Sequence, residues 1–312
     1  MLLASLFYGA YCASLLIHST TIILLSSALL GIGAAHLWTA QQSYLLRLSE
    51  EKMFGRNAGH FSSLHLLGPL LGIITLGFLI DARSFTFSFS IYAFFPLIGF
   101  IILLFIPESR KNVNFSPARF TSPSPQQYRT GYFFFLQRRF WNRTIVRLMF
   151  YWFTIASIFG IMLSVIPIEA GKYFAHYSGG FLLSLFYLIP IISSYHWGRI
   201  SDRIGREKMV SISYIIIIAS IISLLFSSFS VIFLIVGIIA LSFSRAINAP
   251  TNTALLGDIS SDHNVEQLSA LSLSSQQMGV VLGLFAGALP SAAITYTLSL
   301  AFVILSFAIV SP

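Results

Sequence analysis

The stretch Met209–Ser244, MVSISYIIIIASIISLLFSSFSVIFLIVGIIALSFS, contains no Asp, Glu, Lys or Arg. A helix rises about 1.5 Å per residue and the apolar core of a bilayer is about 30 Å thick, so this stretch is about twice as long as one crossing. Three serines, Ser227, Ser228 and Ser230, mark the turn between two crossings. Helices satisfy their own backbone hydrogen bonds in lipid, whereas barrel strands would alternate in polarity, which Ile215–Ile218 does not. We therefore expect two transmembrane α-helices here.

Runs of the same kind cover most of the remaining chain. Residues 1–46 and 267–312 also lack the four charged residue types, and each run is long enough for two crossings. The first run turns at the polar segment 18–21, and the second turns at 287–291, where Gly and Pro interrupt it. The pattern predicts ten helices in all, because four single crossings complete the set, at 61–80, 85–106, 145–168 and 178–197.

The composition excludes several classes of protein. Of the 312 residues, 9% are charged and 56% are hydrophobic, and the mean hydropathy is +0.83. Soluble domains carry about 25% charged residues, so soluble enzymes, disordered chains and disulfide-stapled secreted domains are excluded. The single cysteine, Cys12, forms no intrachain disulfide. The sequence has no phosphate loop, catalytic triad signature or zinc-ligand spacing, so we expect neither an enzyme nor a cofactor or metal. Met1 opens directly into an apolar span, which argues against a cleavable leader.

The distribution of Lys and Arg predicts how the chain is oriented. With Met1 on the cytoplasmic side, 15 of the 18 Lys and Arg residues fall in inner loops. Outer loops contain only Arg83 and Lys172, and Arg245 lies within a span. The positive-inside rule then places both termini in the cytoplasm, and we expect a multi-pass protein of the cell membrane. The net charge of +8 reflects these inner loops, so it implies no nucleic-acid partner.

An internal repeat becomes visible when the chain is aligned with itself at an offset of 211 residues. Gly68 then falls on Gly279, and the acidic turn 48–51 falls on 259–262. A six-helix unit used twice in parallel orientation explains this match without a gap. Under the same offset residue 212 corresponds to residue 1, so the first copy lacks its first two helices.

This offset predicts how the chain is divided. We expect an incomplete N-terminal half of four helices at 1–106, a basic cytoplasmic loop at 107–144 and a complete six-helix half at 145–312. The chain is then either a twelve-helix protein with a missing start, through an incomplete gene model, or a natural ten-helix derivative.

The loop between the sixth and seventh spans carries a recognisable motif. Gly198–Lys208 reads GRISDRIGREK and lies on the expected cytoplasmic side. It resembles the G-x-x-x-D-R-x-G-R-x-K signature of the major facilitator superfamily, whose members have two parallel six-helix halves around a central loop. The resemblance implies an all-α helical bundle in the membrane and secondary active transport of a small solute by alternating access.

Two segments of the first half resemble one branch of this superfamily, the Unc-ninety-three-like or ion-channel-regulator-like proteins. Gly31–Leu45, GIGAAHLWTAQQSYL, is similar to their G-x-G-A-A-x-L-W-T-A-Q-G-x-Y-L stretch, with Gln42 in place of a glycine. Phe54–Phe61, FGRNAGHF, is similar to their G-R-N-S-G-x-F segment. The branch implies a second interpretation, a non-transporting regulator or scaffold whose partner is another membrane protein.

The motif residues Gly198, Asp202, Arg203, Gly205 and Arg206 are interpreted as a gating latch. An Asp at a helix end accepts backbone N–H bonds and pairs with Arg, which would hold one packing of the bundle. The two glycines would allow a close approach and a tight turn. A plain basic loop that only sets orientation is the alternative. We favour the latch because an Asp inside a basic run does nothing for orientation.

Polar residues within one later span are candidates for a substrate cavity. Arg245 is the only Lys or Arg deep in a span, and an intramembrane charge usually faces a cavity or a partner. Asn248 and Asn252 follow on the same helical face, and this stripe would attract an anionic group of the solute. The alternative is a structural Arg245 that pairs with a carbonyl group or reaches toward the interface.

The corresponding span of the first half carries a second set of candidates, Trp38, Gln41 and Gln42. Their indole and amide donors would bind a neutral or anionic solute, or serve only as polar contacts between helices. Glu169, at the outer end of a span, would carry a coupling proton if desolvated, although an exposed acid next to Lys172 is the simpler interpretation. The expected partners are therefore a small solute, a coupling ion and the lipid bilayer.

Overall fold

The computed structural model describes residues 2–17, 19–105, 143–173, 178–260 and 264–310, and this part of the chain is helical. Its first half comprises α1 (Leu2–Ser14), α2 (Thr20–Leu48), the short 3-10 helix η1 (Glu51–Met53), α3 (Phe54–Ala82), α4 (Phe85–Tyr92) and α5 (Phe95–Leu104). Its second half comprises α6 (Arg143–Gly171), α7 (Ser178–Ile204), α8 (Arg206–Leu225), α9 (Val231–Ile259), α10 (Val265–Ala286) and α11 (Ala292–Val310).

These helices coincide with the ten predicted spans, so the prediction of an all-α membrane bundle is confirmed. Within the described residues, eight segments are long and apolar enough to cross a membrane, with α4 and α5 counted together as one. The two other predicted spans are α1, which is apolar but has 13 residues, and α7. The predicted central loop lies outside the described residues up to residue 142.

One predicted span is not a continuous helix. We expected an uninterrupted helix at 85–106, but α4 ends at Tyr92 and α5 begins at Phe95. Pro96 stands in the first turn of α5, where its missing N–H group costs nothing. Because the proline ring also prevents the preceding turn from continuing as a helix, the span is divided at Ala93 and Phe94.

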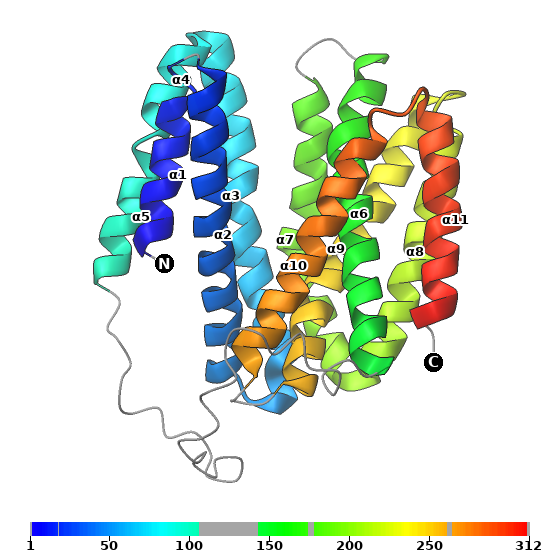
Figure 1. Cartoon of the computed structure of the whole chain (residues 1–312). Coiled ribbons are helices and arrows are strands. Elements are labelled where there is room, and N and C mark those ends of the chain that lie inside the picture. Colours follow the sequence, from blue (N-terminus) through cyan, green and yellow to red (C-terminus); the bar gives the residue numbers. More distant parts are fainter. Residues whose placement is uncertain (1, 18, 106–142, 174–177, 261–263, 311–312) are drawn as a thin grey trace.

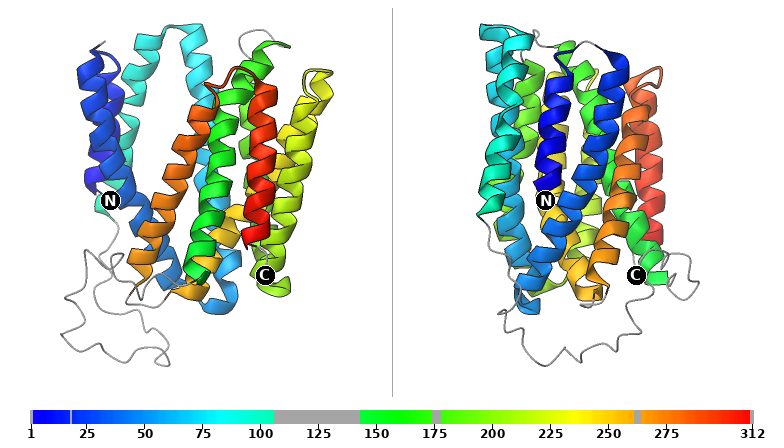
Figure 2. Two further views of the ribbon diagram at one scale, coloured as in Figure 1. Left: turned by 45° about the vertical axis from the view of Figure 1, so that its right-hand side comes forward. Right: turned by 60° about the vertical axis from the view of Figure 1, so that its left-hand side comes forward.

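The helices form two bundles that meet at one end (Figure 1). Helices α1–α5 make up the first bundle and α6–α11 the second. Helices α2 and α3 lean toward the second bundle, where α3 contacts α7 and α9, and α2 contacts α10. Away from these contacts the ribbons of the two bundles diverge (Figure 1). The turned views show the long helices of both bundles standing roughly parallel to one another (Figure 2).

The helix boundaries repeat at the offset found in the sequence. Shifted by 211 residues, Thr20–Leu48 becomes 231–259, which are the bounds of α9, and the start of α3 becomes residue 265, the start of α10. Serine stands at both ends of the two longer helices, with Ser19 and Ser230 at the N-caps and Ser49 and Ser260 at the C-caps. Two copies of one helical unit would show this agreement.

Candidate functional site

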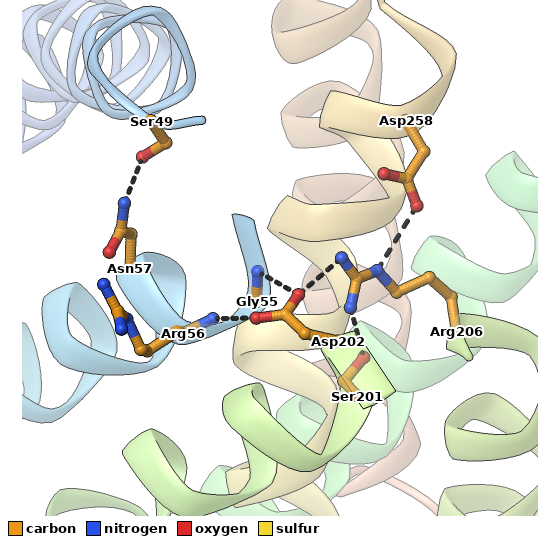
Figure 3. A network of polar contacts seen from close by, with 8 residues as sticks. All are labelled: Ser49, Gly55, Arg56, Asn57, Ser201, Asp202, Arg206 and Asp258. Atoms are coloured by element: carbon orange, nitrogen blue, oxygen red, sulfur yellow. Dashed lines mark hydrogen bonds and ion pairs between the residues drawn. The ribbon is translucent and has the colours of Figure 1, made fainter. Parts of the chain in front are cut away.

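Asp202 joins the two bundles at the end where they meet (Figure 3). It lies in the last turn of α7, and its carboxylate accepts two hydrogen bonds from the backbone of α3. The Gly55 nitrogen lies 2.9 Å from Oδ1, and the Arg56 nitrogen lies 2.8 Å from Oδ2. The Asp202 side chain is 10% exposed. The predicted latch residue therefore connects one half of the molecule with the other.

The free amides at the start of α3 explain why an acid stands at position 202. The first N–H groups of a helix have no acceptor within the helix, and the N-cap residue Met53 provides no side-chain acceptor. Asp202 provides both acceptors from another helix, and its negative charge faces the positive end of the α3 dipole. Hydrogen bonds to an ionised acceptor are about twice as strong as neutral ones. They stabilise the junction, by which we mean the contact of Asp202 on α7 with Gly55 and Arg56 on α3.

Three glycines let α3 and α7 approach until their backbones touch. A Cβ on Gly198 would lie 2.0 Å from the Gly55 carbonyl oxygen, and a Cβ on Gly55 would lie 2.5 Å from the Gly198 oxygen. One turn along α3, a Cβ on Gly59 would lie 2.5 Å from the Ser194 oxygen. Sequence reasoning did not identify Gly55 and Gly59 as site residues. Their four-residue spacing, which places small residues on one face of α3, is the signal that would have done so.

Arg206, in the first turn of α8, holds the Asp202 carboxylate in position. Its Nη2 lies 2.6 Å from Asp202 Oδ1, and its Nη1 donates to the Ser201 hydroxyl at 3.1 Å. Its Nε donates to Asp258 Oδ2, at the end of α9, at 3.3 Å. One guanidinium group thus connects α7, α8 and α9 beside the junction.

The other motif residues differ in what they do. Gly205 has a φ of +97°, a conformation that other residues rarely adopt, and it forms the turn between α7 and α8. Arg203 is exposed and adds no contact to the network that the described residues form. Asn57 donates from Nδ2 to the Ser49 hydroxyl at 3.0 Å and so ties the first turn of α3 to the end of α2.

A second contact between the bundles lies at the same end, where α2 meets α10. Arg47 forms an ion pair with Glu266, and the Ser43 hydroxyl donates to the Ser269 hydroxyl at 3.4 Å. The Arg47 and Glu266 side chains are 43% and 49% exposed, so water and salt screen their attraction. This contact contributes less than the Asp202 network.

Arg245 lies midway along α9 and is enclosed by aromatic rings. Its Cζ atom is 4.4 Å from the ring centre of Phe159, 4.7 Å from that of Phe186 and 4.8 Å from that of Tyr187. Its Nη1 atom is buried and has no hydrogen-bond partner among the described residues. The rings come from α6 and α7, which are distant in sequence, so the sequence did not reveal this aromatic cage.

Asn248, one of the predicted cavity residues, forms hydrogen bonds inside the second bundle. It is 2% exposed, and its Oδ1 accepts hydrogen bonds from the Tyr151 hydroxyl at 2.7 Å and from the Ser213 hydroxyl at 2.8 Å. Its Nδ2 donates to the Ser244 hydroxyl at 3.0 Å. Asn248 therefore fastens α9 to α6 and α8 inside the second bundle.

The remaining predicted cavity residues fall into two groups. Gln42 Oε1 and Asn252 Oδ1 are buried and have no hydrogen-bond partner among the described residues, as is also found for Arg245 Nη1. Trp38 interacts with the Tyr8 hydroxyl of the neighbouring helix α1, and Gln41 is half-buried. The structure thus leaves three of the six candidates with an unpaired polar atom.

Glu169 differs from the exposed loop acid that we considered simpler. It is 3% exposed, near the end of α6, and it forms an ion pair with Lys172. The ion pair with Lys172 is the contact that we expected, but the Glu169 side chain is buried and not exposed.

Comparison with known proteins agrees with the motif. The profile of the Major Facilitator Superfamily matches residues 1–179 and 164–311. None of the curated proteins compared with the chain matched it. The solved structure of the human organic anion transporter MFSD10 (TETRAN) has a TM-score of 0.75 at 14% identity, over 99% of this chain and 76% of that one. A bacterial homologue of the iron transporter ferroportin, in an outward-facing state, has a TM-score of 0.69 at 13% identity, over 99% of this chain and 80% of that one.

Because the family match extends over nearly the whole chain, the chain belongs to the Major Facilitator Superfamily of membrane transporters.

Proposed function

We propose that the chain moves a small solute across the membrane by alternating access, and that the Asp202 network is the latch that closes one side. The carrying observation is that the carboxylate of one bundle caps a helix of the other bundle. Water can replace such hydrogen bonds at both partners, so the contact can open and close without a change in either bundle.

The arrangement of the bundles supports this mechanism. The two bundles meet where α3 contacts α7 and α9, and their ribbons diverge toward the opposite end (Figure 1). Farther along α3 the glycines no longer touch the second bundle, since a Cβ on Gly68, Gly72 or Gly77 would meet no atom within 4 Å. Rocking about the junction would therefore change few contacts at the far end.

The Lys and Arg distribution supports a cytoplasmic position for this junction and for both termini. The described conformation would then be closed toward the cytoplasm. An ion or solute gradient across the cell membrane would drive transport, because the sequence contains no phosphate loop for an ATP motor.

We also propose that the chain belongs to the Unc-ninety-three-like branch. The segment Phe54–Phe61, which resembles that branch, contains Gly55 and Gly59, where α3 contacts α7. Some members of this branch regulate other membrane proteins, so a non-transporting scaffold is the second candidate function. A scaffold would need no opening of the junction, so measuring that opening distinguishes the two functions.

The test is cysteine labelling at the junction. Ser194 is buried at the α3–α7 contact, and we would place a cysteine there in a Cys12→Ser background. Asp202→Asn removes the ionised acceptor from α3. Maleimide labelling of the Ser194→Cys variant in membranes should then become at least about tenfold faster, because the junction opens more often.

Glu207→Gln is the matched control. Glu207 is an exposed acid in the first turn of α8, so this substitution changes the charge equally without touching α3. Its labelling rate should equal that of the parent. Equal rates in the Asp202→Asn variant and its parent would contradict the latch and favour the scaffold.

A further inference from the structure

The guanidinium group of Arg245 has no counter-ion among the residues that the structure describes. Arg245 lies 14 residues from either end of α9, which corresponds to about 20 Å of helix on each side. No ion pair between Arg245 and a carboxylate is found among the described residues. A buried charge normally requires an opposite charge, and the described residues provide none for Arg245.

The positions of the acidic residues show why no carboxylate pairs with this group. Every acid in the described part of the chain lies within two residues of a helix end, namely Glu50, Glu51, Asp81, Glu169, Asp202, Glu207, Asp258 and Glu266. Arg245 lies at the middle of its helix, where the described acids do not reach. No described residue supplies a counter-charge at this depth, whereas a bound anionic ligand would.

The surroundings of Arg245 fit a ligand that is both anionic and apolar. The rings of Phe159, Phe186 and Tyr187 stabilise the cation through their π-faces, but they accept no strong hydrogen bond from Nη1. The N–H groups of Nη1 therefore lack an acceptor among the described residues, and an acidic group of a ligand would supply one. Phe186 and Tyr187 are buried, so the partly exposed ring of Phe159 is the one that would contact the apolar part of the ligand.

Arg245 also lies on the side of the second bundle that faces α3 of the first bundle. His65 of α3, in the first bundle, is exposed and interacts electrostatically with Arg245 in the second. Helix α3 packs against α7 and α9, which carry two of the cage rings and Arg245 itself. A ligand that binds Arg245 from this side would contact both bundles, as a transported solute must under alternating access.

We infer that the solute is an organic anion, whose acidic group pairs with Arg245 and whose apolar body lies beside Phe159, the partly exposed ring of the cage. That this anion is the transported solute rests on the proposed transport function. The site itself requires only binding, so it can be tested without any transport.

The experiment is an equilibrium binding titration on the full-length chain in detergent. Radiolabelled benzoate, phenylphosphonate and indole acetate are the three probes, each titrated directly, with neutral benzamide and sodium chloride as competitor controls. Wild-type protein should bind at least one of the three aromatic anions saturably, and benzamide and chloride should not compete. Arg245→Gln should weaken binding by about 30-fold or more, and Arg245→Lys should retain part of it, because the positive charge remains.

A second pair of variants covers the case in which Arg245→Gln does not fold. His65→Glu places a carboxylate opposite Arg245 at an exposed position, where it should compete with the ligand and weaken binding by about tenfold. His65→Gln, the matched neutral control, should bind as wild type does.

Three results would overturn the inference. These are no binding of any aromatic anion to the wild type, competition by chloride or benzamide at equal strength, and binding that is unchanged in His65→Glu or in folded Arg245→Gln. Anion binding together with unchanged labelling at Ser194 would instead leave this site in place and contradict the transport mechanism.

Discussion

Replacing Gly198 with alanine should open the junction by forcing α3 and α7 apart. The new Cβ would lie 2.0 Å from the Gly55 oxygen, and real Cβ atoms essentially never lie closer than 3.0 Å to such an atom. The two backbones must therefore separate by about 1 Å. The hydrogen bonds to Asp202, now 2.8 and 2.9 Å, would then exceed about 3.8 Å, where they no longer count as hydrogen bonds.

The cost of this separation follows from the bonds that are lost. Two hydrogen bonds to a charged group contribute about 1.5–3 kcal/mol each. The helix propensity that alanine adds is the same in the closed and the open state, so it cancels. The closed junction should thus lose about 3–6 kcal/mol relative to the open one. Since about 1.4 kcal/mol corresponds to a tenfold change, the ratio of open to closed molecules should rise by about 100-fold or more.

The assay is a distance measurement between spin labels on the two bundles. Lys52, beside α3, and Lys208, at the start of α8, are both exposed and accept labels in a Cys12→Ser background. Gly198→Ala should move the distance distribution toward longer values. Gly77→Ala is the control, because a Cβ there meets no atom within 4 Å, and it should leave the distribution unchanged. Identical distributions for both variants would refute the backbone-contact argument.

Three further substitutions have expected outcomes of different sizes. Arg206→Lys should speed labelling at the junction by less than the loss of Asp202 does, because an ammonium group cannot reproduce the fork of the guanidinium; equal labelling to the parent would contradict its positioning role. Tyr151→Phe should destabilise the second bundle by about 1 kcal/mol, since it removes a hydrogen bond to Asn248, and a thermal unfolding curve should show a midpoint a few degrees lower. Glu266→Gln should change the spin-label distances little, because an exposed ion pair contributes at most about 1 kcal/mol.

The helices could be predicted because charges are so rare in this chain. Each long run without Asp, Glu, Lys or Arg became one or two helices, and the positions of Ser230 and Ser260 at the ends of α9 follow from the polar breaks. The interruption of the span 85–106 was missed because the apolar run hides Pro96, whose effect depends on its place in the turn.

The site could be predicted only in part, because its contacts involve groups that leave no trace in the sequence. Asp202 was identifiable from the motif, but its partners are backbone N–H groups, which every residue type except proline carries. The cage around Arg245 joins α6, α7 and α9, and spacing within one helix says nothing about which rings of another helix will face it. Asn248 shows the same limit, because its hydrogen-bond partners lie on α6 and α8 and spacing within α9 does not identify them.

The two contacts between the bundles occupy related places in the repeat but differ in chemistry. At the offset of 211 residues Gly55 corresponds to Glu266, and both stand in the first turn of a helix that meets the other bundle. At Gly55 a bare amide meets a carboxylate that is 10% exposed, whereas at Glu266 two exposed side chains meet in an ion pair. Hydrogen bonds shielded from water are stronger than screened ion pairs, so most of the free energy that closes the junction lies between α3 and α7. The two bundles should consequently separate first along α2 and α10 and last at Asp202.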